Sequence, residues 1–386
     1  MLLEKEPIVP ATRLILVAAL ALAPAAAVWS QSGDTPRPAA TPARQDGDAA
    51  PPSNARYLSQ PLTREIFTAD PSAHVFNGKI YVYPSHDIDG PTPDDDLGNQ
   101  YAMRDYRVLS MDRVGGKVTV GGVALDIAQV PWASKQAWAP DAAYKDGTYF
   151  LYFPARDKTR DKHGLGQFRI GVATSKNPMG PFVPEPNFIP GSYSIDPAVF
   201  TDADGASYMY FGGIWGGQLQ RWKDGRFDPN GSDTDLKQDD QPALSGKVVR
   251  MTPDMKAFAE PVRDAVIVDE KGQPIKGGDH DRRFFEAAWM FKKDGKYYYT
   301  YSTGDTHWLN YAIGDNPYGP FTYKGHILKP VQGWTTHHSI IEHAGKWWLF
   351  YADTQLSGKN HLRNVKVTEL KFAADGSIPT IDPFVR

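Results

Sequence analysis

The sequence predicts an all-β protein whose single folded domain is a five-bladed β-propeller. Three observations lead to this prediction: a unit that recurs five times, a Gly-containing turn inside each copy, and a second strand rich in aromatic and β-branched residues. Short hairpins repeated every few tens of residues are typical of propellers, in which each blade is one small antiparallel sheet. The five copies are ADPSAHVFNGKIYVYPS (69–85), APDAAYKDGTYFLYFPA (139–155), DPAVFTDADGASYMYFGG (196–213), EAAWMFKKDGKYYYTYST (286–303) and HHSIIEHAGKWWLFYAD (337–353).

Composition restricts the function. The chain has 386 residues, of which 41% are hydrophobic and 12% aromatic, enough for one large core. Its net charge is -3 and it has no basic run, so nothing favours nucleic acid or an anionic membrane as a partner. It has no cysteine, which excludes disulfides and Cys-ligated metals but is compatible with either cytoplasm or periplasm.

The N-terminal region predicts export. Arg13 precedes an apolar, Ala-rich run (14–28), and the chain turns polar at Ser30. This pattern is typical of a secretory signal peptide, here assigned to 1–31, with an uncleaved anchor as the alternative. The following Pro- and Ala-rich segment (32–56) predicts a disordered linker, and the propeller is expected over 57–386. We therefore expect a secreted or periplasmic protein that has no membrane contact after signal removal.

Acidic residues begin several of the repeats. Asp70 and Asp196 each precede a proline and an apolar strand, and Glu286 begins the fourth repeat. An Asp-Pro step disfavours helix and favours an extended or turn conformation, so simple turn punctuation is the alternative for each Asp. Equivalent positions of successive blades converge on one axis, which predicts that the three acids share one cavity.

Glu286 lies in the apolar run RRFFEAAWMF. Desolvation raises the pKa of a carboxyl in such surroundings and suits it to hold a proton near neutral pH; pairing with Arg282 or Arg283 is the alternative. One carboxylate that faces water and one protonated carboxyl in an apolar wall can carry out glycoside hydrolysis. A third acid, Asp196, would orient the proton donor and raise its pKa by like-charge proximity.

The motifs resemble glycoside hydrolase family 43, a family of five-bladed propellers. The similar segments are ADPSAHVFNGKIYVYPSHD, QAWAPDAAYKDGTYFLYF, SIDPAVF, FFEAAWMF and HHSIIEHAGKWWLFYAD. The resemblance implies that Asp70 is the general base, Glu286 the general acid, and Asp196 the acid that modulates pKa and orients. It also implies inversion at the anomeric carbon, for which the two catalytic carboxyls should lie roughly 6.5–9.5 Å apart.

The resemblance implies two further roles. The first His of the segment HHS, His337, would lie on the propeller axis beside a hydrated calcium ion; a hydrogen-bonded core pair with His338 is the alternative. Because calcium prefers oxygen ligands, one imidazole would be joined mainly by waters. Arg363, in HLRNVKVTEL, would reach the innermost sugar, with a surface Arg on an edge strand as the alternative. No organic cofactor is expected.

Residues near the repeat tips are candidates for sugar contacts. Trp138 and Trp215 are the preferred aromatic walls, and Trp308 and Trp334 are further candidates. Asp87 and His307 are candidate ligands for sugar hydroxyls, although closing a turn is the alternative for both. Most of the ten Trp residues must fill the gaps between blades.

The resemblance to family 43 implies an exo-acting inverting enzyme that releases terminal xylose from β-1,4-xylo-oligosaccharides. The alternative is an α-L-arabinofuranosidase, or an enzyme with both activities, that acts on hemicellulose side chains. A retaining fructosidase propeller is disfavoured, because the first motif reads ADPS and the chain has no cysteine. A carbohydrate-binding propeller without catalysis is the alternative from outside the enzymes.

Overall fold

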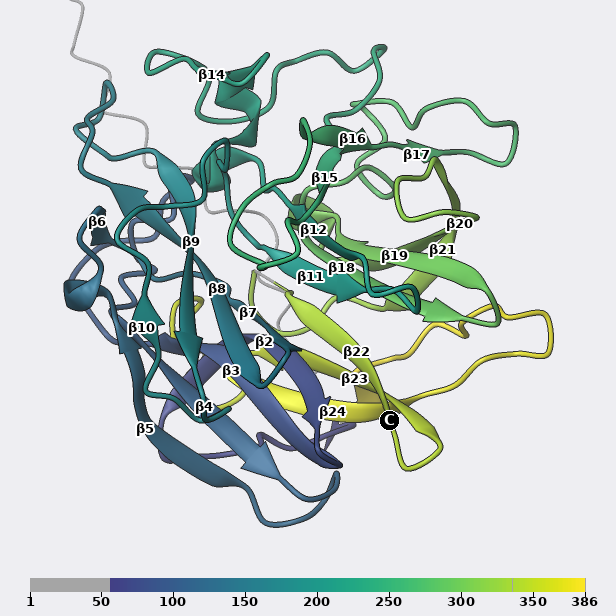
Figure 1. Ribbon diagram of the computed structural model, residues 1–386. Helices are drawn as coiled ribbons and strands as arrows, with labels where there is room; N and C mark the ends of the chain where they lie inside the picture. Colours follow the sequence, from purple (N-terminus) through teal and green to yellow (C-terminus); the bar gives the residue numbers. More distant parts are fainter. Residues whose placement is uncertain (1–55, 335, 386) are drawn as a thin grey trace, which may run out of the picture. The chain divides into compact units, whose positions relative to one another are not determined.

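The computed structural model describes residues 56–334 and 336–385. The expected signal peptide and nearly all of the expected linker lie outside the described residues; Arg56, the last linker residue, already belongs to a strand. The regular secondary structure of the described residues consists of strands and four short 3-10 helices, which confirms the predicted all-β class (Figure 1). Across these two ranges, no helix has both the length and the apolar character needed to span a membrane.

The five expected repeats form the inner hairpins of five blades. The strands of blades 1 and 2, from the axis outward, are β2 (Phe67–Phe76), β3 (Lys79–Asp87), β4 (Asp105–Met111) and β5 (Thr119–Asp126), then β7 (Asp141–Lys145), β8 (Thr148–Asp157), β9 (Phe168–Ser175) and β10 (Val183–Pro184). The short strand β6 (Ala133–Lys135) pairs with the far end of β8. Blade 3 consists of β11 (Ala198–Thr201), β12 (Ser207–Phe211), β15 (Gly246–Arg250) and β16 (Arg263–Ala265).

Blades 4 and 5 complete the ring. Their strands are β18 (Glu286–Lys293), β19 (Lys296–Ser302), β20 (Leu309–Gly314), β21 (Phe321–Leu328) and the edge strand β17 (Ile267–Val268), then β22 (His338–His343), β23 (Lys346–Asp353) and β24 (Asn364–Leu370). A small hairpin, β13 (Trp222–Lys223) and β14 (Arg226–Phe227), lies in the connection within blade 3. The 3-10 helices are η1 (Ile127–Gln129), η2 (Trp215–Gly217), η3 (Leu219–Arg221) and η4 (Gly304–Thr306).

Left-handed two-residue turns set the register of four of the five hairpins. In each, both turn residues have positive φ, and the second is Gly, the residue that adopts this conformation at no steric cost. These turns are Asn77–Gly78, Asp146–Gly147, Asp294–Gly295 and Ala344–Gly345. Blade 3 has a longer connection (202–206) in which Gly205 has a φ of 83°. The Gly-containing turns predicted from the sequence are therefore confirmed.

The inner strands line the axis and close the ring. Contacts run from β2 to β7, from β7 to β11, from β11 to β18, from β18 to β22, and from β22 back to β2 (Figure 1). The segment that leads into β2 also bonds to blade 5, through Leu62 N–H to Val365 O at 2.9 Å and Thr68 N–H to Arg363 O at 2.9 Å. Strand β1 (Arg56–Tyr57) pairs with β25 (Phe384–Val385). The two ends of the domain are thus joined by backbone hydrogen bonds.

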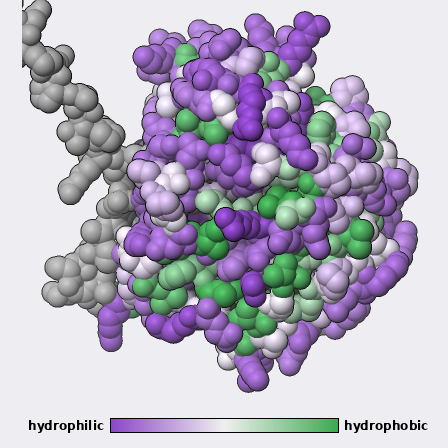
Figure 2. Space-filling model, turned by 90° about the vertical axis from the view of Figure 1, so that its left-hand side faces the viewer, coloured by the Kyte–Doolittle hydropathy of each residue, from purple (hydrophilic) through white to green (hydrophobic). Residues whose placement is uncertain are grey.

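The core fills the space between blades and is unusually rich in tyrosine. Its most deeply buried large side chains include Tyr152, Tyr210, Tyr299 and Phe153. Several tyrosines place their hydroxyls on backbone carbonyls, which satisfies the buried polar atom. Figure 2 shows a face on which green hydrophobic patches are small and separated by purple hydrophilic residues. Aromatic content therefore serves mainly to pack neighbouring blades.

Candidate active site

The three predicted acids stand where the inner strands are irregular. Asp70 lies in β2 with φ of 48°, at a register shift between Ala69 and Ser72. Glu286 is the first residue of β18, beside a second register shift, and Ala287 has φ of 61°. Asp196 precedes β11 with φ of 57°. Left-handed residues other than Gly cost about 1–3 kcal/mol each and cluster at functional sites.

The left-handed backbone differs from a simple Asp-Pro strand start. The sequence suggested an extended or turn conformation for Asp70 and Asp196, and the structure places both in the left-handed region. A bulge or left-handed residue at this point re-aims the side chain from the blade toward the axis. The irregularity of the inner strands is therefore what points the acids into a common site.

Asp70 has both carboxyl oxygens engaged. Oδ1 accepts a hydrogen bond from Arg363 Nη1 at 2.8 Å, and Oδ2 accepts one from the Ser85 hydroxyl at 2.6 Å. Asp70 itself is only 6% exposed. Because two donors on opposite oxygens fix the plane of the carboxyl, Asp70 is held in one orientation.

Arg363 is in turn held by Asp87. The Arg363 Nε and Nη2 atoms donate to the two Asp87 carboxyl oxygens at 2.9 and 2.8 Å, and the Arg363 backbone N–H donates to Oδ2 at 2.8 Å. The guanidinium also lies over the Tyr101 ring, 4.8 Å from its centroid. The Asp87 side chain has no exposed area, so it influences the site through its contact with Arg363. The sequence predicted Asp87 as a sugar ligand, whereas this placement favours a role in orienting Arg363.

Asp196 is linked to the Glu286 segment by a backbone hydrogen bond and to Glu286 itself by charge repulsion. Asp196 Oδ2 accepts the backbone N–H of Ala287 at 2.9 Å, which ties it to the residue after Glu286. Burial, followed by the negative charge of Asp70, raises the pKa of Glu286 to about 8. Burial, followed by the charges of Glu286 and Asp70, raises the pKa of Asp196 well above its usual value. Glu286 therefore carries a proton at neutral pH, as an acid catalyst must.

His337 lies between two of the acids. Its Nδ1 is 3.8 Å from Asp196 Oδ2 and 4.0 Å from Asp70 Oδ1. Burial lowers the pKa of His337 to about 4, against the opposing charge of Asp70, so the ring is neutral at pH 7. The next residue, His338, points its Nε2 at the Thr300 hydroxyl at 2.6 Å and belongs to the core. Of the two histidines, only His337 accompanies the acids.

The neutral imidazole of His337 can bind a metal ion, and calcium is the ion that the sequence predicts here. Calcium takes six to eight oxygen ligands. Among residues 56–334 and 336–385, no group of three or more His, Asp or Glu side chains is arranged to hold a metal ion. These residues therefore fit a calcium ion only if waters supply most of its ligands and His337 supplies one nitrogen.

The predicted aromatic walls take different positions. Trp138 is 8% exposed and donates its indole N–H to the Tyr101 carbonyl at 2.8 Å. Its ring packs on that of Phe168, at 4.5 Å between centroids. Trp138 therefore helps to hold the Tyr101 backbone in place. Trp215 is partly exposed, and its ring lies 5.4 Å from that of Phe285, the neighbour of Glu286. Trp215 is accordingly the better placed of the two to meet a substrate.

His307 and two further tryptophans were also candidates. His307 is 5% exposed, and its Nδ1 lies 2.7 Å from the Trp334 carbonyl. Trp334 is partly exposed and lies 5.8 Å from Trp215, ring centroid to centroid. Trp308 instead stacks on His326 at 4.1 Å. His307 and Trp334 thus belong to the rim beside Glu286, whereas Trp308 packs elsewhere in blade 4.

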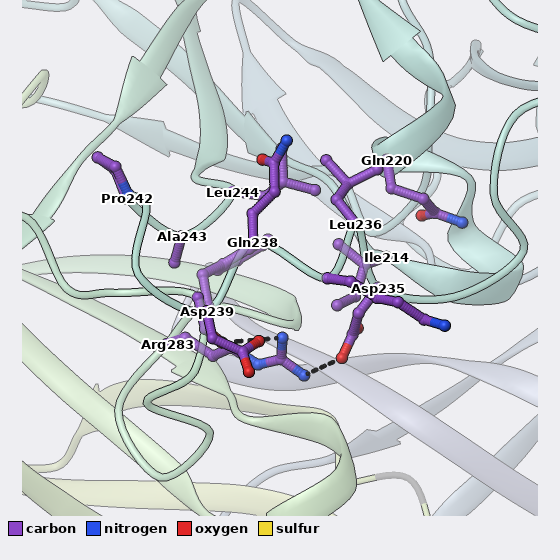
Figure 3. A pocket seen from close by; sticks show the side chains of 13 residues that line it. Ile214, Gln220, Asp235, Leu236, Gln238, Asp239, Pro242, Ala243, Leu244 and Arg283 are labelled. Carbon is purple, nitrogen blue, oxygen red and sulfur yellow. Dashed lines mark hydrogen bonds and ion pairs between the residues drawn. The ribbon is translucent and has the colours of Figure 1, made fainter.

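Some contacts were missed from the sequence. Ser85 and Tyr101, which hold Asp70 and Arg363, are an ordinary strand Ser and loop Tyr with no motif to mark them. The Ala287 N–H is a backbone group and has no sequence signal at all. The pocket in Figure 3 is also distinct: it is lined by residues such as Ile214, Asp235, Leu244 and Arg283, and none of the three acids reaches it.

The arrangement can cleave a glycosidic bond. It brings together the Asp70 carboxyl, fixed by two donors, the Glu286 carboxyl, whose pKa is raised to about 8, and the Asp196 carboxyl, whose pKa is also raised. Acid–base glycoside hydrolysis requires one carboxyl that donates a proton and a second carboxyl that can activate water.

Comparison with known proteins agrees with this chemistry. A xylosidase/arabinosidase 43A from Humicola insolens is 57% identical over 84% of this chain and 99% of its own length. A β-xylosidase from Xylanibacter ruminicola is 51% identical over 82% of this chain and 97% of its own. Both alignments span nearly the whole of each relative.

A solved structure is similar as well. It is a β-xylosidase/α-arabinofuranosidase from a compost microbial metagenome, in complex with xylotriose and in a calcium-free form. It is 62% identical, covers 86% of this chain and all of its own, and has a TM-score of 0.83. The family model of glycosyl hydrolases family 43 matches residues 63–378. The chain therefore belongs to glycosyl hydrolases family 43.

Proposed function

We propose that the protein is an exo-acting, inverting β-xylosidase that releases terminal xylose from β-1,4-xylo-oligosaccharides. The observation that carries the proposal is the pairing of Asp70, fixed by Arg363 and Ser85, with Glu286, whose pKa is raised to about 8. Relatives more than 50% identical are named xylosidases, and the similar metagenomic enzyme holds xylotriose. These similarities support xylose as the sugar.

The reaction is a single displacement at the anomeric carbon. A water attacks that carbon from the face opposite the departing oxygen, and Asp70 takes the proton of the water. Glu286 gives its proton to the glycosidic oxygen as the bond between this oxygen and the anomeric carbon breaks. Afterwards Asp70 is protonated and Glu286 is ionised, and exchange with solvent restores both.

Asp196, Arg363 and calcium would each influence this step. Asp196, bonded to the Ala287 N–H, fixes the backbone beside the proton donor. Arg363 donates to Asp70 Oδ1 and so helps to fix the plane of this carboxyl. Calcium, bound near His337 through waters, would add positive charge close to Asp70 and Asp196.

Arabinofuranoside cleavage is the second candidate activity. Two relatives above 50% identity are named xylosidase/arabinosidase, and the metagenomic enzyme is named for both activities. Xylopyranose and arabinofuranose present similar hydroxyl patterns, so one pocket can admit both sugars.

Time-resolved NMR on 4-nitrophenyl β-xyloside and α-L-arabinofuranoside tests the proposal. We expect faster release of xylose, with the α-anomer appearing first because the configuration inverts. Initial release of β-xylose from the β-xyloside would reject the inverting mechanism. No turnover of either glycoside, with xylotriose still bound, would favour a carbohydrate-binding propeller without catalysis.

We further propose that the enzyme acts in the periplasm or outside the cell. The support is Arg13 and the apolar run 14–28, both outside the described residues. N-terminal sequencing of the protein recovered from culture medium and periplasm tests this. A mature protein that begins near residue 31 supports export, and a full-length protein confined to the cytoplasm rejects it.

A further inference from the structure

A long connection within blade 3 (212–245) lies directly against the proton donor. The backbone N–H of Ile214 donates to the Phe285 carbonyl at 3.0 Å. A Cβ placed on Gly213 would lie 3.1 Å from the Glu286 Cβ. The backbone at Gly213 therefore packs directly against the side chain of Glu286. Residues 213–215 therefore form the wall of the site next to Glu286.

Trp215 is the large side chain of this wall. It has φ of 55°, a conformation that is rare for a bulky residue and points to a specific constraint. Its indole Nε1–H donates to Asp235 Oδ1 at 2.8 Å. Its ring packs against Phe285 and against Trp334, at 5.4 and 5.8 Å between centroids. One hydrogen bond and two aromatic contacts together define the plane of the Trp215 ring.

Asp235 connects this ring to the segment that leads into Glu286. Its second oxygen accepts from Arg283 Nη2 at 3.1 Å, as Figure 3 shows. The Arg283 side chain is 7% exposed and also donates to the Gly277 carbonyl at 3.2 Å. Asp305 lies 3.5 Å from the same Nη2 atom and is paired with His280. Arg283 precedes Glu286 by three residues, so Asp235 links the wall to the chain that carries the acid.

A small cavity lies beside Asp235. The pocket of Figure 3 has a volume of ≈ 40 Å³ and is lined by Asp235, Arg283 and Leu244, among others. The two Asp235 carboxyl oxygens are bonded to Trp215 and to Arg283, so Asp235 acts on the site through Trp215.

We propose that Asp235 is a positioning residue that holds Trp215 as a stacking wall for the sugar on the leaving-group side of the cleaved bond. This inference rests on the proposed function. The general acid protonates the departing oxygen, so the wall next to Glu286 faces the departing sugar, whereas Arg363, stacked on Tyr101, lies beside Asp70. Trp334 extends the same wall, and an aromatic face packs well on the apolar face of a pyranose.

Two substrates with the same terminal xylose test this. Xylobiose places a sugar on the leaving-group side, whereas β-xylosyl fluoride places only fluoride there. For Asp235→Ala we expect KM for xylobiose to rise about tenfold, with kcat/KM for the fluoride within about twofold of wild type. Asp235→Asn keeps an oxygen acceptor for the indole N–H and should recover most of the xylobiose affinity.

A double-mutant cycle identifies the route of the effect. If Asp235 acts through Trp215, Asp235→Ala adds nothing to the xylobiose defect of Trp215→Phe, which lacks the indole donor. Asp233→Asn is the matched control, because Asp233 pairs with Arg221 in the same connection and does not bond Trp215. It should leave the xylobiose-to-fluoride ratio unchanged.

Several outcomes would overturn the proposal. Equal losses on both substrates would make Asp235 a structural residue, and an unchanged KM for xylobiose would remove it from substrate binding. Additive losses in the double variant would show that it does not act through Trp215. A wild-type protein that cleaves neither substrate would instead reject the β-xylosidase function itself.

Discussion

The Arg363 guanidinium donates one hydrogen bond to Asp70, at 2.8 Å, and two more to the carboxyl oxygens of Asp87. The three residues come from blade 5, from β2 and from β3, so one buried cation joins the last blade to the first. All three are at least nine-tenths buried. The cluster joins blade 5 to blade 1 and at the same time orients Asp70, the proposed general base.

Arg363→Lys should therefore impair catalysis strongly, although it conserves the positive charge. Lysine has no planar fork, so it cannot satisfy Asp70 and both oxygens of Asp87 together. Breaking a buried pair costs about 3–5 kcal/mol, and we expect kcat/KM on xylobiose to fall at least 100-fold. Steady-state kinetics and thermal unfolding would measure the two effects. An activity within threefold of wild type would contradict the role given to Arg363.

Glu286→Gln should abolish hydrolysis of xylobiose, because the leaving oxygen then lacks a proton donor. We expect kcat to fall by roughly 10²–10⁴-fold, with xylotriose binding preserved in calorimetry. A dinitrophenyl xyloside, whose leaving group needs no proton, serves as control and should lose much less. Substantial turnover of xylobiose by this variant would rule out Glu286 as the acid.

The pKa of Glu286 predicts the alkaline limit of activity. The acid must be protonated to act, and its pKa is raised to about 8. In the free enzyme kcat/KM should therefore fall tenfold per pH unit above that value. A pH–rate profile on xylobiose checks this. A decline centred near pH 5 would show that Glu286 is ionised at neutral pH.

The same shift predicts a pH-dependent gain in stability for Glu286→Gln. With the folded pKa raised above the unfolded one, the native state binds more protons between them, so wild-type stability falls as pH rises from about 4.5 to about 8. Glutamine carries no charge and avoids this loss. The variant should unfold at a higher temperature than wild type at pH 9 and at nearly the same temperature at pH 4, measured by calorimetry. An equal difference at both pH values would exclude the charge as its cause.

Calcium should affect the rate if it binds near His337. Exhaustive chelation is expected to lower kcat on xylobiose severalfold, and added calcium should restore it. His337→Ala should make the enzyme insensitive to both treatments. An unchanged rate in the chelated wild type would remove the ion from the mechanism.

The architecture was predictable because each blade repeats a local pattern. The alternating aromatic strands and turns such as Asn77–Gly78 fix hairpins without knowledge of distant residues. The positions of Asp70, Asp196 and Glu286 followed from their place at the start of those hairpins. Residue types and spacing therefore contained both the fold and the location of the three acids.

The supporting contacts were not predictable in this way. Ser85 is bonded to Asp70, and Asp235 to Trp215, by side-chain geometry that depends on a bulge or an irregular loop. Asp87 and Trp138 were expected to contact the sugar. In the structure Asp87 accepts hydrogen bonds from Arg363, and Trp138 donates one to the Tyr101 carbonyl. A position near the tip of a repeat does not distinguish a residue that faces the substrate from one that supports it. That distinction depends on the direction of each side chain.

The pairing of β1 with β25 makes the domain suitable for circular permutation. Because residues 56–57 and 384–385 lie on adjacent strands, a few glycines would bridge them. New ends could then be opened at a tight turn such as Asp294–Gly295, at the opposite end of β18 from Glu286. A permutant of this kind would retain its catalytic residues while exchanging which blade is synthesised last.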